Sequence, residues 1–191
     1  MTARAILLCI CLAGAAARAG LALSLPPEPQ TEDERDYLSI ARHIRESREF
    51  SVHPGVPTAY RAPGYPVLLA GLQAVLGDTT RPLRLAQALL GTLLCPLAFL
   101  LARRLWDDAA GLMAAGLCAV HPYLIYLTSQ FVVETAFAPL LLVAFLLLLA
   151  VDDDRAAGEP RAGVDDQVAD LPGAVVDQEV LDPADIAVAR L

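Results

Sequence analysis

The side chains best suited to chemistry lie in one polar segment, residues 25–84, between the first apolar run and three later ones. The segment carries Asp33, Glu34 and Asp36 near its start and Arg61 in a loop rich in Pro and Gly. Carboxylates can act as general bases, and a guanidinium can bind phosphate through two parallel hydrogen bonds. Acids also suit the first turn of a helix, and the acid cluster taken alone favours that interpretation over catalysis.

Two short helices are expected to position these groups. From Asp33, apolar residues recur at helical spacing through Ile44 with Arg and Glu on the other face, which predicts an amphipathic helix on the membrane surface. Residues 51–66 hold enough Pro and Gly to predict a loop without regular structure. The apolar stretch 64–76 is too short to span a membrane, and it predicts a re-entrant or interfacial helix beginning at Pro66.

Apolar runs of about 20 residues flank the polar segment, and each is long enough to cross a bilayer as a helix. They cover residues 5–25, 84–102, 109–127 and 131–151. The first run also resembles a secretory signal, although its apolar continuation favours an uncleaved span. Arg18 interrupts this run, and it either extends its side chain to the membrane surface or has a function. Pro96 predicts a kink in the second span, and Pro122 interrupts the third.

The fold class predicted from this pattern is an all-α polytopic membrane protein with about four transmembrane helices. Arg4 and the turn at Arg103–Arg104 fall on one side, which the positive-inside rule makes cytoplasmic. The polar segment then faces outward, as a multi-pass protein of the plasma membrane would place it. The expected divisions are a first span, an extracytoplasmic loop, three further spans and an acidic disordered tail: residues 1–25, 26–83, 84–151 and 152–191.

Charge is distributed unevenly along the chain. All 14 basic residues are Arg, and residues 152–191 account for the net charge of −8, with 11 acids against three Arg. This tail has no aromatic residue, which predicts disorder, and its composition is also what a shifted reading frame in GC-rich DNA would produce. No basic patch indicates nucleic-acid binding. The four Cys lie in apolar runs, and neither they nor His53 and His121 have metal-ligand spacing, so no metal site is predicted.

Several motifs occur in an order that resembles a known family. They are residues 33–37 followed by Ile40 and Ala41, residues 58–66 (Thr-Ala-Tyr-Arg-Ala-Pro-Gly-Tyr-Pro), residues 84–91, and Pro122 followed by Glu134. Together they resemble the front part of polyprenyl-phosphate-sugar-dependent glycosyltransferases of the GT-C fold. The branch in question contains protein O-mannosyltransferases, lipid A aminoarabinose transferases and rhizobial galacturonosyl transferases. Ala62 stands where that family has a Pro, and Val133 where Thr is usual.

This resemblance implies sugar transfer from a polyprenyl-phosphate donor to a hydroxyl of a lipid, glycan or protein outside the cytoplasm. Matched to the family motif, Asp33 is the general base and Glu34 orients it or helps to bind the acceptor. Arg61 is the candidate for the donor phosphate, or alternatively it holds the Pro-rich loop through backbone carbonyls. Tyr37 and Glu134 are further candidates for substrate binding, although Glu134 also suits a helix start.

Such enzymes have about a dozen spans, so the resemblance covers only an N-terminal fragment and leaves the activity of this polypeptide open. The alternative function is a non-catalytic membrane fragment or subunit that acts in binding or assembly. A small transporter is less consistent, because only the first span carries a charge well inside the membrane. The motifs do not decide the sugar, the acceptor or the use of a divalent metal.

Overall fold

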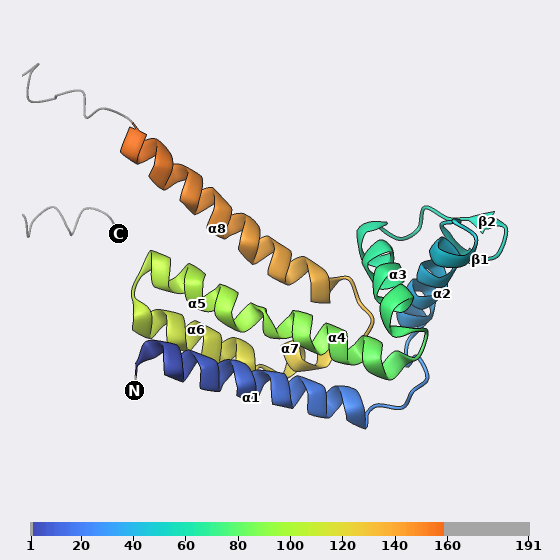
Figure 1. Ribbon diagram of the computed structural model, residues 1–191, viewed down its shortest axis with the longest axis horizontal. Helices are drawn as coiled ribbons and strands as arrows, with labels where there is room; N and C mark the ends of the chain where they lie inside the picture. The colour runs from blue at the N-terminus through green and yellow to red at the C-terminus, as the bar shows by residue number, and fades with distance from the viewer. Residues whose placement is uncertain (1, 159–191) are drawn as a thin grey trace, which may run out of the picture. The chain divides into compact units, whose positions relative to one another are not determined.

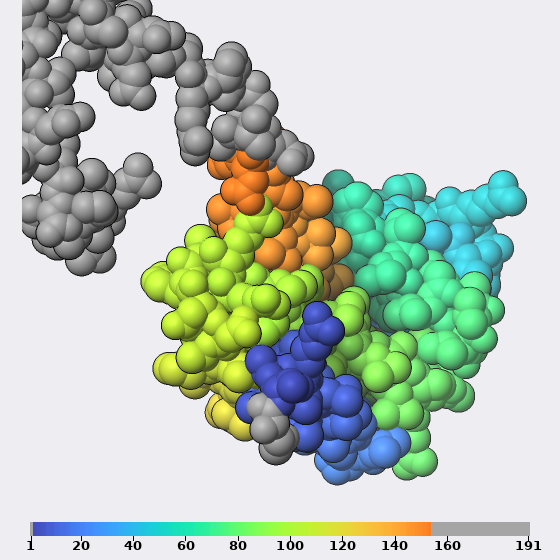
Figure 2. Space-filling model, turned by 60° about the vertical axis from the view of Figure 1, so that its left-hand side comes forward, coloured from blue at the N-terminus to red at the C-terminus, as the bar shows by residue number. Residues whose placement is uncertain are grey.

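The first apolar run folds into α1 (Ala3–Ser24), one helix long and apolar enough to cross a membrane. The computed structural model describes residues 2–158, and residues 1–149 form one unit (Figure 1). In this unit α1 packs against α4 (Thr80–Thr92) and α6 (Asp108–Val120), and α5 (Leu94–Leu105) packs against α6. Figure 2 shows the side chains of α1, in blue, lying against the green and yellow helices.

The second predicted span is also present, but it begins earlier and is interrupted. Residues 80–105 are long and apolar enough to cross a membrane, and the helix breaks at Leu93 between α4 and α5. Pro96 explains the position of the break, because it has no N–H for the carbonyl of Thr92 and its ring crowds that carbonyl. The expected kink is therefore a one-residue break at Leu93, three residues before Pro96.

The third predicted span, residues 109–127, is not one helix. It divides into α6 and α7 (Pro122–Leu127), and neither helix alone reaches the length needed to cross a membrane. Pro122 causes the division, since it cannot donate to the carbonyl of Cys118 four residues earlier. Among the described residues, three helical segments have a membrane-spanning length, rather than the four expected.

The side chain of Arg18 in α1 lies at the break between α6 and α7. Its side chain is fully buried and donates to the carbonyl of Cys118 at 2.8 Å and to that of Gly14 at 3.1 Å. Its Nη1 also lies 3.5 Å from the carbonyl of Ala119. Arg18 thus does not extend to the membrane surface, because it replaces the backbone donor that Pro122 lacks.

The polar segment folds largely as two helices joined by a hairpin. Helix α2 (Glu32–Glu46) and helix α3 (Gly64–Leu76) confirm the two short helices expected there, each beginning one or two residues earlier than predicted. Between them, β1 (Ser51–His53) pairs antiparallel with β2 (Val56–Pro57). The prediction of a loop without regular structure is wrong at this hairpin, because Gly55 takes a positive φ of 76° and turns the chain.

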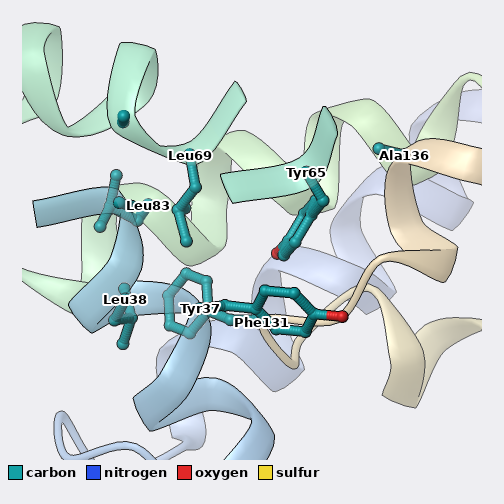
Figure 3. Close-up of a cluster of buried hydrophobic side chains, with 9 residues drawn as sticks. Tyr37, Leu38, Tyr65, Leu69, Leu83, Phe131 and Ala136 are labelled. Carbon is teal, nitrogen blue, oxygen red and sulfur yellow. The ribbon is translucent and has the colours of Figure 1, made fainter. Parts of the chain in front are cut away.

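The apolar faces of α2 and α3 share a core with α4 and with the segment before α8. Figure 3 shows the labelled members of this cluster: Tyr37 and Leu38 from α2, Tyr65 and Leu69 from α3, Leu83 from α4, Phe131 from the segment before α8, and Ala136 from the first turn of α8 (Glu134–Gly158). The ring of Tyr65 meets the ring of Tyr37 edge to face, with centroids 4.9 Å apart. The polar segment is thereby fixed to the ends of the spanning helices.

The fourth predicted span forms α8 (Glu134–Gly158), which is long and apolar enough to cross a membrane. It begins three residues later than expected, with Glu134 at its first position. It also continues to Gly158, so the expected disordered tail from residue 152 is helical in its first seven residues. The remainder of the expected tail lies outside the described residues, and the change of reading frame, expected near residue 151, stays a prediction.

Candidate active site

An open pocket of about 450 Å³ lies where α2 faces the hairpin and the loop that follows it. Helix α2 contributes Glu32, Asp33, Arg35, Asp36 and Ser39. The hairpin and loop contribute Val52, His53, Tyr60 and Arg61. Its volume lies within the usual range for sites that bind small molecules, and its lining is mostly polar and charged.

The start of α2 places the acids of this pocket. Thr31 caps the helix, and its hydroxyl accepts a hydrogen bond from the backbone N–H of Glu34 at 3.2 Å. Residues three apart share a helix face, so Asp33 and Asp36 point toward the loop. Tyr37 and Leu38 turn toward the core instead. The amphipathic pattern thus fixes which acids reach the pocket.

Arg61 connects the loop to both of these acids through one nitrogen. Its Nη2 donates to Oδ1 of Asp33 and, at 2.9 Å, to Oδ2 of Asp36. The three side chains differ in exposure, with 15% of Arg61, 25% of Asp36 and 55% of Asp33 accessible to solvent. Asp33 is therefore the partner that solvent and ligands reach most easily.

Two aromatic rings hold the guanidinium from its faces. The Cζ of Arg61 lies 4.6 Å from the ring centre of Tyr60 and 5.1 Å from that of Tyr37, both within cation–π range. Burial disfavours the charged form of Arg61, but the hydrogen bonds to Asp36 and Asp33 outweigh this effect, so the pKa of Arg61 is raised. The pocket thus contains a permanent positive charge.

Tyr37 lies between the pocket and the start of α8. Burial raises the pKa of Tyr37, and the negative charges of Asp33 and Glu134 add to this effect while Arg61 opposes it. Glu134 is exposed and does not line the pocket, but its charge influences Tyr37. Behind Tyr37, the Tyr65 hydroxyl donates to Gln87 at 2.8 Å, and burial raises the pKa of Tyr65.

Glu34 has a different environment from its neighbour Asp33. Its carboxylate is fully buried, accepts the backbone N–H of Phe131 at 3.0 Å, and lies 3.7 Å from Nη2 of Arg84. Arg84 is also fully buried and donates to the carbonyls of Pro26 and Glu28. This buried pair joins the start of α2 to α4 and to the segment before α8, and it lies outside the pocket.

The structure thus brings Asp33 and Arg61 together at the pocket, with Tyr37 behind the guanidinium, and places Glu34 and Glu134 elsewhere. Sequence reasoning did not assign a role to Asp36, although its position one turn after Asp33 was a usable signal. It also missed His53, which it considered only as a metal ligand and which lines the pocket. In the part of the chain that the structure describes, no three His, Cys, Asp or Glu side chains converge as metal ligands would.

Comparison with known proteins identifies the family. The model of the dolichyl-phosphate-mannose-protein mannosyltransferase family matches residues 57–158, which is more than half of the chain. The match includes Arg61 and Glu134, whereas Asp33 and Asp36 precede it. No curated protein and no solved structure matches the chain. The match confirms the GT-C resemblance at family level: the chain belongs to the dolichyl-phosphate-mannose-protein mannosyltransferase family, a family of membrane glycosyltransferases of the GT-C type.

Proposed function

We propose that this chain takes part in moving a sugar from a polyprenyl-phosphate donor to a hydroxyl of a protein, lipid or glycan acceptor. The reaction takes place on the extracytoplasmic face of the plasma membrane. The observation that carries the proposal is the contact between Asp33 and Arg61 at an open polar pocket. A proton acceptor and a phosphate-binding cation are the two groups that such a transfer needs.

The chemistry divides between these two residues. Asp33 accepts the proton of the acceptor hydroxyl while the oxygen of that hydroxyl forms a bond to the anomeric carbon of the sugar. The bond from that carbon to the phosphate oxygen breaks, and the electron pair leaves with the phosphate. Arg61 stabilises the departing phosphate with charge and N–H donors. No general acid is required, because a phosphate is already a good leaving group.

The other predicted residues have supporting parts in this proposal. Tyr37 stabilises the guanidinium of Arg61 through a cation–π contact, with 5.1 Å between Cζ and the centre of the ring. Glu34 acts on Asp33 indirectly, because its buried contacts hold the helix turn that carries both acids. Glu134 contributes negative charge near Tyr37, at the edge of the membrane where an acceptor or donor headgroup would approach.

Replacing Asp33 with Asn tests the assignment of the base. Because a positioned general base contributes about 10²–10⁴ in rate, Asp33→Asn should lower transfer at least 100-fold. The measurement is sugar transfer by membranes containing the chain, with polyprenyl-phosphate mannose as the donor. Glu46→Gln is the matched control, since it removes one acid from the last turn of the same helix and should leave the rate unchanged. Equal rates for Asp33→Asn and the unaltered chain would remove Asp33 as the base.

One observation favours the alternative, a non-catalytic membrane subunit. Asp33 and Asp36 are both bound to Arg61, as they would be in an ion pair that only stabilises the loop. On that hypothesis, membranes with the chain transfer no sugar from any polyprenyl-phosphate donor, and Arg61→Gln weakens folding without changing lipid-phosphate binding. The effect of Arg61→Gln on the binding of a polyprenyl phosphate therefore separates the two functions: a large loss supports the transferase, and unchanged binding supports the subunit.

A further inference from the structure

Arg61 is one positive charge that already pairs with two carboxylates, Asp33 and Asp36, so a donor phosphate would be the third anion around it. We propose that Arg61 exchanges one of them: it binds Asp33 and Asp36 in the free protein, and the donor phosphate displaces Asp33 while Asp36 keeps its hold. Asp36 is thus a positioning residue, and donor binding releases the base. This inference rests on the proposed function, since it needs a phosphate in the pocket.

In the free protein one carboxylate oxygen of Asp33 is already hydrogen-bonded to Arg61. Its Oδ1 accepts a hydrogen bond from Nη2 of Arg61, so this lone pair cannot accept the proton of an acceptor hydroxyl. The contact must therefore loosen before Asp33 can act as a base at that oxygen.

Arg61 has unused donors for an incoming phosphate. Both of its carboxylate bonds go through Nη2. Its Nε–H is buried and has no hydrogen-bond partner among the residues that the structure describes. A buried N–H without a partner is unfavourable, and a phosphate oxygen would satisfy it. The guanidinium is thus prepared for an anion with several acceptor oxygens.

Burial decides which carboxylate leaves. Asp36 is 25% exposed and Asp33 is 55% exposed, so water can replace the lost bond to Asp33 more fully. Leaving the less exposed Asp36 without a partner would cost more. The rings of Tyr60 and Tyr37 hold the guanidinium itself in place. When a third anion arrives, Asp33 is therefore the group that moves.

Without Asp36 the exchange should fail. With Asp36 replaced, a phosphate and Asp33 are two anions at Arg61, as many carboxylates as it pairs with in the free protein. In Asp36→Asn, Arg61 can bridge the phosphate and Asp33, and the base stays occupied. Asp36→Glu keeps the third negative charge and should restore the release. This difference separates a positioning role from a merely structural one.

Carbodiimide labelling of carboxylates in the 191-residue chain, held in lipid nanodiscs, tests the exchange. Farnesyl phosphate is the probe, farnesol is the control without phosphate, and binding is measured separately with radiolabelled farnesyl phosphate. Labelling of Asp33, read from its peptide by mass spectrometry, should rise at least threefold with farnesyl phosphate and not with farnesol. In Arg61→Gln the labelling should be fast from the outset, and Glu46 should label equally in all samples.

The outcomes separate the two hypotheses. In Asp36→Asn, farnesyl phosphate should still bind while the rise in Asp33 labelling falls to less than half, and Asp36→Glu should recover it. Binding without any rise in the unaltered chain would overturn the exchange and leave the proposed function standing. An undiminished rise in Asp36→Asn would overturn the role of Asp36. Failure of farnesyl phosphate to bind would contradict the proposed donor itself, and the exchange with it.

Discussion

At the scale of single residues, Asp33 and Glu34 show how neighbours in sequence acquire different roles. Successive helix positions point about 100° apart, so one carboxylate faces the pocket while the other enters the protein. Glu34 is fully buried beside Arg84, and its oxygens accept backbone N–H groups of Gln30 and Phe131. Its part in the site is therefore to hold the helix turn that carries Asp33.

Removing Glu34 should destabilise the protein strongly. Glu34→Ala leaves Arg84 buried without its anion, a change that typically costs about 3–5 kcal/mol. Glu34→Gln keeps an acceptor for the backbone N–H of Phe131 and should lose less. The measurement is the free energy of unfolding in SDS micelles, followed by near-UV circular dichroism.

Asp78→Ala is the control for this prediction. It removes a solvent-exposed ion pair with Arg45, whose bond is 2.7 Å long, and it should cost far less than Glu34→Ala, because water screens and replaces such a pair. Comparable losses for Glu34→Ala and Asp78→Ala would mean that the Glu34–Arg84 pair does not stabilise the fold as proposed.

At the scale of elements, proline positions determine where apolar runs stop being continuous helices. Pro122 divides the third run into α6 and α7, and the freed carbonyl of Cys118 turns to a side chain of another helix. Arg18 supplies that donor from α1, and Gly14 leaves the room for it, since a Cβ there would lie 3.1 Å from Nη1 of Arg18. The charged Arg18 inside the apolar helix α1 thus satisfies a carbonyl left free by the helix break at Pro122.

The pairing of Arg18 with the break predicts energetic coupling between Arg18 and Pro122. Arg18→Met should cost about 1–3 kcal/mol, because buried carbonyls lose their donors. In the Pro122→Ala background the loss should be smaller, since residue 122 then has an N–H for the carbonyl of Cys118. A double-mutant cycle in SDS unfolding measures the coupling, expected at about 0.5–3 kcal/mol. Additive losses would show that Arg18 is not held by this break.

At the scale of the unit formed by residues 1–149, the pocket and the arginine-rich turn lie at opposite ends of the helices. Helices α2 and α3 are at one end, and the turn between α5 and α6 is at the other (Figure 1). With three segments of spanning length, these ends should face opposite sides of the membrane. The positive-inside rule, applied to the short turn at Arg103–Arg104, predicts that this end is cytoplasmic, which is the orientation that the proposed reaction requires.

Single cysteines introduced at the two ends test this orientation. In a background without the four native Cys, Val56→Cys should react with a membrane-impermeant maleimide on intact cells, whereas Trp106→Cys should react only after permeabilisation. Both positions are well exposed, so accessibility within the protein does not limit the reaction. The reverse pattern would place the pocket in the cytoplasm and contradict the proposed side of the reaction.

Much of this architecture follows from local pattern. The first and fourth apolar runs predicted α1 and α8, and the spacing of Tyr37, Ile40 and Ile44 predicted α2, because helical periodicity is a property of short stretches of sequence. The third span was overestimated, since an apolar run does not show whether a proline will divide it. The hairpin at residues 51–57 was missed because two strands this short leave no alternating pattern.

For this protein the sequence by itself determined the apolar helices, the polar segment between them and the presence of Asp33 and Arg61 in that segment. Tertiary structure alone decided that Asp33 and Arg61, which are 28 positions apart in the sequence, form a hydrogen bond. It also decided that Glu34 instead binds the backbone of Phe131, 97 positions away. The physical reason is one of range. Helix formation depends on neighbours within a few residues, whereas the burial and ion pairing of a carboxylate depend on which distant segments pack around it.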